Sequence, residues 1–221
     1  MNCDAVIFDF DGVIGKTMED NYQAWDAAFR NIGIVIDQEL YLATEGMNTK
    51  GVAKMFLAQH GANRSLRDEV VNAKEGYYQK NNRFEFYPGV IELLQKFSQH
   101  FQLGLVSGAG FDRLKMTIPP NILKLFSAIV AGDHIEHSKP HPEPYQKAVQ
   151  KIGFEKSRCV AIENAPYGIT SAKNAGLYCI AICSTLKRKY LSEADLIVNN
   201  VADIESIISA PKNSGETYAV S

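Results

Sequence analysis

The chain has few cysteines and no long apolar stretch, and each absence narrows its class. Its 221 residues include four cysteines and no Cys-x-x-Cys pair. This argues against a zinc or redox motif, so we expect buried, reduced thiols in a cytoplasmic protein. No apolar run reaches the length of a membrane-spanning helix, which predicts no membrane attachment. The four cysteines are Cys3, Cys159, Cys179 and Cys183.

The chain also lacks an excess of either charge. It has 23 basic and 25 acidic residues, a net charge of −2, with the two signs interspersed. A protein that binds nucleic acid usually shows a basic patch, so we expect no nucleic-acid partner. The length fits one large domain or one domain with an insertion, and it is sufficient to bury a core.

Two kinds of hydrophobic pattern divide the chain. Within residues 16–87, apolar side chains recur at three- and four-residue steps, which predicts helices. Residues 89–208 alternate strand-like runs with helical patterns, and the run at 5–8 reads as a further strand. This alternation predicts an α/β fold with a doubly wound parallel sheet. We therefore expect a core in 1–15 and 88–210, a helical insertion in 16–87, and a disordered tail in 211–221.

Two acids follow the first strand directly. Asp9 and Asp11 are two residues apart, so in an extended chain both carboxylates face one side while Phe10 faces the other. Two neighbouring acids are costly unless a cation holds them. Gly12 allows a sharp turn just beyond them.

Polar residues also follow three other predicted strands. Parallel sheets bind ligands beyond the carboxyl ends of their strands, so these residues are expected to converge on the two acids. They are Ser107 with Gly108 and Ala109, then Lys139, and then Glu163 with Asn164.

Together these residues suit the chemistry of a phosphate ester. Asp9 can attack phosphorus to form an aspartyl-phosphate, and Asp11 can exchange the proton with the leaving oxygen and with water. Ser107 and the backbone N–H groups after it can hold phosphate oxygens, and Lys139 adds a positive charge. Oxygen ligands for Mg²⁺ would come from Asp9, Asp11, Glu163 and Asn164.

Each element also has an ordinary explanation. A loop lysine is usually solvated, and a Glu-Asn pair often caps a helix. The set as a whole also resembles a phospho-accepting receiver domain, but here the acceptor at position 9 precedes a large insertion, which disfavours that alternative. An inactive binding protein on the same fold is a further alternative, because a fold does not imply a function.

The same residues resemble the four motifs of the haloacid dehalogenase-like superfamily of phosphohydrolases. The motifs are Asp9-Phe-Asp11-Gly12-Val, Ser107 after Leu-Val, Lys139-Pro-His-Pro, and Glu163-Asn164-Ala-Pro-Tyr-Gly168-Ile. The last two strings are similar to the subgroup of sugar-phosphate phosphatases and β-phosphoglucomutases. That resemblance implies a four-helix cap in the insertion, and catalytic roles for Asp9, Asp11, Ser107 and Lys139. A monomer is the default expectation, because the fold would contain both cap and core.

The chain departs from this subgroup at two positions. Many relatives have Glu-Asp where this chain has Glu163-Asn164, so we expect a working but weaker Mg²⁺ site. Mutases that resemble this chain have a histidine four residues before the cap tryptophan, here Trp25, and this chain has Asn21 instead. This weighs against a mutase.

We therefore predict an Mg²⁺-dependent phosphatase of a small phosphorylated metabolite, with a sugar phosphate as the first expectation. A β-phosphoglucomutase-type transfer is the alternative. Substrate contacts are expected from Ser107, Gly108, Ala109 and Lys139. In the cap they are expected from Thr17, Asn21, Trp25, Gly46, Thr49, Lys50 and Lys74.

Overall fold

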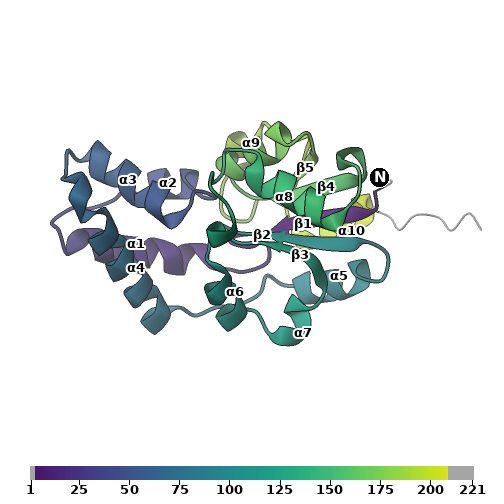
Figure 1. Cartoon of the computed structure of the whole chain (residues 1–221), viewed down its shortest axis with the longest axis horizontal. Helices are drawn as coiled ribbons and strands as arrows, with labels where there is room; N and C mark the ends of the chain where they lie inside the picture. Colours follow the sequence, from purple (N-terminus) through teal and green to yellow (C-terminus); the bar gives the residue numbers. More distant parts are fainter. Residues whose placement is uncertain (1–2, 209–221) are drawn as a thin grey trace, which may run out of the picture.

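The computed structural model describes residues 3–208, so the expected disorder of residues 211–221 lies outside the described part. The core is a parallel sheet of six strands in the order β3-β2-β1-β4-β5-β6 (Figure 1). This confirms the predicted α/β fold with a parallel sheet. The strands are β1 (Ala5–Asp9), β2 (Gln102–Val106), β3 (Phe126–Val130), β4 (Cys159–Glu163), β5 (Tyr178–Ile182) and β6 (Leu196–Val198).

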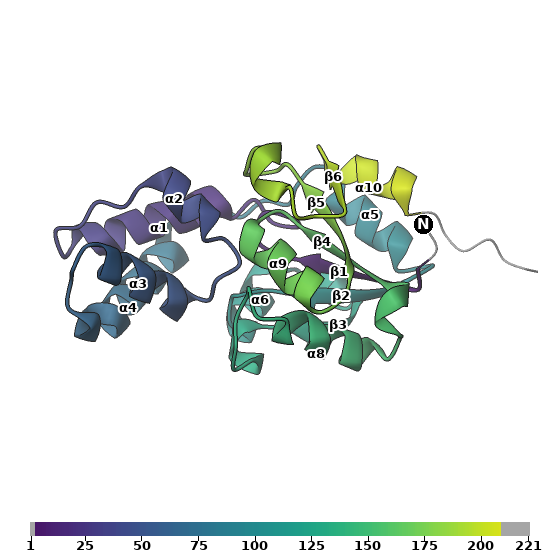
Figure 2. The same cartoon turned by 90° about the horizontal axis from the view of Figure 1, so that it is seen from above.

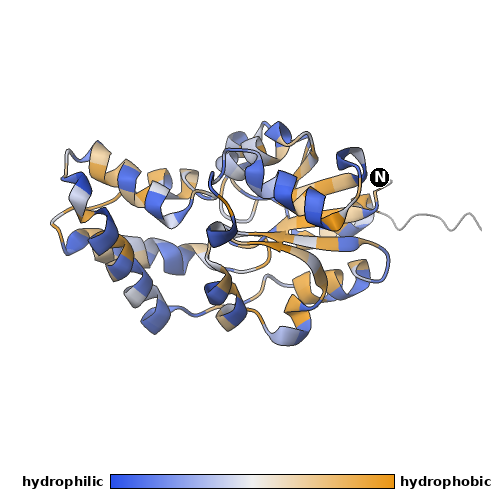
Figure 3. Ribbon diagram, viewed as in Figure 1, coloured by the Kyte–Doolittle hydropathy of each residue, from blue (hydrophilic) through white to orange (hydrophobic). Residues whose placement is uncertain are grey.

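Helices cover both faces of the sheet. Val6 and Phe8 of β1 pack into the core on one face, and Ala5 and Ile7 into the core on the other. A strand buried on both sides needs apolar residues at every position, which explains the continuous run in β1 (Figure 3). The first face carries α5 (Val90–Phe97), α6 (Phe111–Thr117), α7 (Pro120–Leu123) and α10 (Val201–Ile207), and the second carries α8 (Glu143–Ile152) and α9 (Pro166–Asn174).

Between β1 and α5 the chain forms a separate helical body beside the sheet (Figure 2). It has a hydrophobic core of its own, in which Phe29 packs between Trp25 and Phe56 with ring centroids 5.8 and 5.7 Å apart. This core is separate from the two that flank the sheet. Its helices are α1 (Met18–Arg30), α2 (Gln38–Ala43), α3 (Thr49–Gln59) and α4 (Arg67–Asn81).

The two segments that join the insertion to the core run side by side. The Lys16 N–H donates to the Glu85 carbonyl at 2.8 Å, and the Tyr87 N–H donates to the Ile14 carbonyl at 3.0 Å. Gly15 and Phe86 form an antiparallel bridge between them. The two segments that link the insertion to the core are therefore held together by backbone hydrogen bonds.

All four cysteines are free, and only Cys183 is partly exposed. In the part of the chain described, no helix combines the length and apolar character needed to cross a membrane.

Candidate active site

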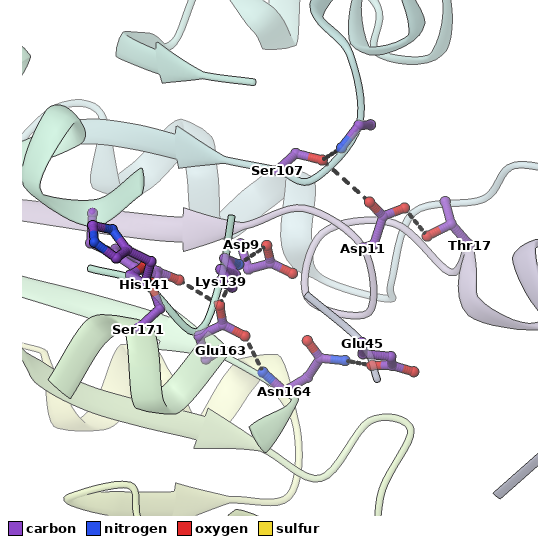
Figure 4. A network of polar contacts seen from close by, with 12 residues as sticks. Asp9, Asp11, Thr17, Glu45, Ser107, Lys139, His141, Glu163, Asn164 and Ser171 are labelled. Atoms are coloured by element: carbon purple, nitrogen blue, oxygen red, sulfur yellow. Dashed lines mark hydrogen bonds and ion pairs between the residues drawn. The ribbon is translucent and has the colours of Figure 1, made fainter. Parts of the chain in front are cut away.

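The polar residues at the strand ends converge at the carboxyl edge of the sheet (Figure 4). Asp9 ends β1 and Glu163 ends β4, the neighbouring strand. Ser107 follows β2 directly, and Lys139 lies in the loop between β3 and α8. Parallel strands bring their carboxyl ends to one edge, and β1 lies where the strand order changes direction. The topology therefore gathers residues that are up to 154 positions apart.

Lys139 lies between two carboxylates. Its Nζ atom is 2.6 Å from Asp9 Oδ1 and 2.6 Å from Glu163 Oε1, and the side chain is only 2% exposed. Burial by itself would lower the pKa of Lys139, but the charges of Asp9 and Glu163 outweigh burial and raise it. Lys139 is thus a permanent cation against the candidate nucleophile.

The loop that carries Lys139 is held from helix α8. Glu143 accepts the N–H groups of Glu136 at 3.0 Å and His137 at 2.8 Å, at the start of the loop. Two residues further along α8, the Tyr145 hydroxyl donates to Glu163 Oε1 at 2.6 Å from a fully buried position. Tyr145 was not among the predicted site residues, although it lies only six residues after Lys139. It fixes the carboxylate that in turn fixes the lysine.

Asp11 has its own set of partners on the other side of Asp9. Its Oδ1 atom accepts hydrogen bonds from Thr17 Oγ1 at 2.5 Å and from Asn21 Nδ2 at 3.5 Å. Its Oδ2 atom lies 3.3 Å from Ser107 Oγ. Thr17 and Asn21 both come from the insertion, so the predicted acid/base residue contacts both parts of the protein.

Arg113 is a further partner of Asp11 that the sequence did not point to. Its Nη2 atom is 2.9 Å from Asp11 Oδ1, and its guanidinium lies over the Tyr78 ring at 4.8 Å. Arg113 sits in α6, which begins just after the Ser107 loop. The only signal in the sequence that could have pointed to Arg113 is its place in the first turn of the helix after the phosphate-binding loop.

A cavity lies between the sheet edge and the insertion. Asp9 and Asp11 line its base and Arg113 its side. Seven of the predicted substrate contacts line it as well: Gly108, Ala109, Asn21, Trp25, Gly46, Thr49 and Lys74. Ser107 and Lys139 are buried beside it, and Thr17 is buried against Asp11. Lys50 is exposed and does not line the cavity, because it lies on the outer side of α3.

Lys74 is an unusual cavity residue because it is 2% exposed. Its Nζ atom is 3.0 Å from Glu75 Oε1 and lies over the rings of Trp25 and Tyr78 at 5.7 and 4.9 Å. Burial, together with the charge of Arg113, lowers the pKa of Lys74 to about 8. The cavity therefore contains a cation whose pKa lies below that of a solvated lysine.

The residues present fit a magnesium ion. Asn164 Oδ1 is buried and, within residues 3–208, has no hydrogen-bond partner. It lies on the same side as Asp9 and Asp11 in Figure 4. Carboxylate and amide oxygens are the ligands that Mg²⁺ prefers, and a buried acceptor without a donor is a place for a cation. Asp9, Asp11 and Asn164 would hold it.

Glu163 is placed differently from Asn164. Its Oε1 atom accepts from Lys139 and Tyr145, and its Oε2 atom accepts the Asn164 N–H at 3.1 Å. Gly168 makes room for this carboxylate, since a methyl carbon there would lie 2.1 Å from its carboxyl carbon. Both oxygens of Glu163 are already engaged, so its main contact here is with Lys139.

Comparisons with known proteins place this chain among the hydrolases of one family. A family model described as haloacid dehalogenase-like hydrolase matches residues 6–182. The validoxylamine A 7'-phosphate phosphatase of Streptomyces hygroscopicus subsp. limoneus is 27% identical over 204 residues, covering 90% of this chain and 94% of that protein. The β-phosphoglucomutase of Bacillus subtilis (strain 168) is 28% identical over 209 residues, covering 90% and 91%.

A solved structure shows the same fold. The β-phosphoglucomutase of Clostridium difficile aligns with a TM-score of 0.78 at 23% identity, covering 92% of this chain and 93% of that chain.

Proposed function

The chain belongs to the haloacid dehalogenase-like hydrolase family, and from that premise we propose that it is an Mg²⁺-dependent phosphatase of a small phosphorylated metabolite. The observation that carries the proposal is the pairing of Asp9 with Lys139 at the base of the cavity. Asp9 is 5% exposed and lies 2.6 Å from the lysine. A buried carboxylate with a fixed cation beside it can approach an anionic phosphate without prohibitive repulsion.

In the first step, an Asp9 carboxylate oxygen attacks phosphorus and the bond from phosphorus to the ester oxygen breaks. Asp11 gives its proton to that leaving oxygen. Lys139 and Ser107 hold the phosphoryl oxygens throughout. The bound metal would cancel part of the charge repulsion between nucleophile and substrate.

In the second step, water attacks the phosphorus of the aspartyl-phosphate. Asp11, now a carboxylate, takes the proton from the water, and the bond between phosphorus and Asp9 breaks. Inorganic phosphate leaves and both acids return to their starting states. Asp11 therefore serves first as the acid and then as the base. Its hydrogen-bond partners hold its carboxyl group in position for both steps.

We propose that the insertion, residues 16–87, acts as a cap that opens for substrate and closes to exclude water. The two paired linkers near Gly15 and Phe86 are its natural hinge. If solution scattering shows the same shape with and without a substrate analogue, this motion does not occur.

The lining of the cavity favours a polar substrate such as a sugar phosphate. Asn21 and Thr49 offer hydrogen-bonding groups, and Lys74 and Arg113 offer positive charge above Asp11. Such groups suit a hydroxyl-rich leaving group better than an apolar one.

A mutase reaction is the second candidate, since one similar protein is named a β-phosphoglucomutase. It would use the same aspartyl-phosphate but return the phosphoryl group to a sugar. Asn21 lies 3.5 Å from Asp11, at the position where the resembling mutases have a histidine. An amide takes up no proton near neutral pH, so it cannot assist Asp11 as a histidine does.

The test is phosphate release from a panel of phosphorylated metabolites, with Mg²⁺ or with a chelator. We expect release that requires Mg²⁺ and disappears in Asp9→Asn. Release that persists in Asp9→Asn would refute the aspartyl-phosphate. Conversion of β-glucose 1-phosphate with a phosphoryl donor, without net release, would favour the mutase.

A further inference from the structure

The insertion touches the predicted metal site through one side chain, Glu45. Its Oε2 atom accepts a hydrogen bond from Asn164 Nδ2 at 2.5 Å and another from Thr185 Oγ1 at 3.1 Å. Glu45 lies in the loop between α2 and α3 and is 5% exposed. Glu45 and Asn164 are 119 positions apart in the sequence. None of the sequence motifs includes it.

This contact determines which way the Asn164 amide faces. The NH₂ group of the amide points toward Glu45, because Nδ2 donates and Oε2 accepts in this contact. The amide oxygen then points to the opposite side, toward Asp9 in Figure 4. Thr185 Oγ1 at 3.0 Å gives Nδ2 its second acceptor. With both hydrogens of the NH₂ group engaged, the oxygen is held free for a cation.

The contact also restores a charge that the core lacks. Asparagine brings no charge to the metal site, and both hydrogen-bond partners of Glu45 are neutral. Its other oxygen, Oε1, is buried and has no partner within the described chain. Burial and the nearby charges of Asp9 and Asp11 raise the pKa of Glu45, so its charged form needs a cation nearby. A metal on Asn164 Oδ1 would be that cation.

We propose that Glu45 is a positioning residue for the metal site, which orients Asn164 Oδ1 and supplies the missing negative charge from the insertion. The inference rests on the proposed function, because it assumes that Asp9, Asp11 and Asn164 hold Mg²⁺. The sequence led us to expect weak Mg²⁺ binding because Asn164 has no charge. Under this proposal the core and the insertion each contribute part of the negative charge at the metal site. The site is complete only when the Glu45 loop lies against the core.

This arrangement predicts an unusual result for Asn164→Asp. If the asparagine simply leaves the site short of charge, the substitution should tighten Mg²⁺ binding. If Glu45 already supplies the charge, the substitution brings two carboxylates to about the 2.5 Å contact and should weaken binding. Adding Glu45→Gln should then recover it, since the two residues would have exchanged roles.

The experiment is Mg²⁺ binding by isothermal titration calorimetry on the full chain and four variants. We expect Glu45→Gln and Asn164→Asp each to weaken binding by about tenfold to a hundredfold, as for other partners of metal ligands. The double variant should bind within about threefold of the wild type. Glu39→Gln is the matched control, because Glu39 also joins the insertion to the core, at Tyr190, but lies outside the cavity. It should leave binding unchanged.

Tighter or unchanged Mg²⁺ binding in Asn164→Asp would overturn the inference, and so would unchanged binding in Glu45→Gln. Circular dichroism checks that each variant is folded. If Glu45→Gln does not fold, Asn164→Asp alone still decides, because the two explanations predict opposite signs.

Phosphate release by the wild type separates this inference from the proposed function. Mg²⁺-dependent release lost in Asp9→Asn, together with unchanged binding in Glu45→Gln, would leave the phosphatase intact and remove only the role of Glu45. No Mg²⁺ binding by the wild type would remove both.

Discussion

Removing the charge of Lys139 should destabilise the protein strongly, and by an amount that depends on pH. In Lys139→Met, the carboxylates of Asp9 and Glu163 lose the ammonium that lies 2.6 Å from each. Both are buried, so water cannot replace it. Breaking a buried ion pair by removing one partner costs about 3–5 kcal/mol, a large part of the stability of a typical domain.

The sign of the pH dependence follows from the acids left behind. Burial raises the pKa of Asp9, Lys139 opposes that rise, and the charge of Glu163 adds to it. Without Lys139 the folded-state pKa lies further above the unfolded value of about 3.9. The folded variant then binds more protons than the unfolded chain, so its free energy of unfolding falls as pH rises from about 4 through the raised value. The difference from wild type should be larger at pH about 8 than at pH about 5.

The assay is urea denaturation followed by far-UV circular dichroism, in chelator, at both pH values. Lys173→Met is the control, because Lys173 also pairs with a carboxylate, Asp195, but is 37% exposed. Solvent screens that pair, so its loss should cost at most about 1 kcal/mol. A loss below about 1 kcal/mol in Lys139→Met at pH about 8, or an equal loss at both pH values, would refute the reasoning.

Three further predictions concern the cavity. The KM for a phosphorylated substrate should rise above pH about 8, where Lys74 loses its charge, and steady-state kinetics of Lys74→Met should show no such rise. Arg113→Gln removes a charged hydrogen bond to Asp11, worth about 1.5–3 kcal/mol, and should lower kcat about tenfold to a hundredfold; an unchanged kcat would mean that Arg113 does not position Asp11. Gly168→Ala forces a methyl carbon to within 2.1 Å of the Glu163 carboxyl group. It should lower the free energy of unfolding by about 1–3 kcal/mol and with it the thermal midpoint; an unaltered melting curve would contradict the close packing.

Much of the core could be read from the sequence because its patterns are local. A strand buried on both faces needs a continuous apolar run, as Ala5 to Phe8 of β1 provide, and Asp9 and Asp11 come directly after that run. Parallel strands share one edge, so residues at four strand ends had to meet. The family model and the similar proteins confirm the expected family, and the structure brings Asp9, Asp11, Ser107 and Lys139 together.

The insertion was harder, because its contacts join residues that no local pattern relates. Lys50 and Lys74 were both predicted to contact substrate, but α4 turns Lys74 into the cavity while α3 leaves Lys50 exposed. No pattern in the sequence singled out Arg113, which α6 places 2.9 Å from Asp11.

The sequence by itself determined the sheet and the groups at its carboxyl edge, since strand periodicity and strand-end chemistry both act over a few neighbouring residues. Only the tertiary structure decided which partners Glu163 and Asn164 each contact. Glu163 is held by Lys139 and Tyr145, whereas Asn164 is turned by Glu45, 119 residues away. These contacts depend on the packing of the insertion against the core, where we propose that Glu45 supplies the charge that the Glu163-Asn164 motif lacks.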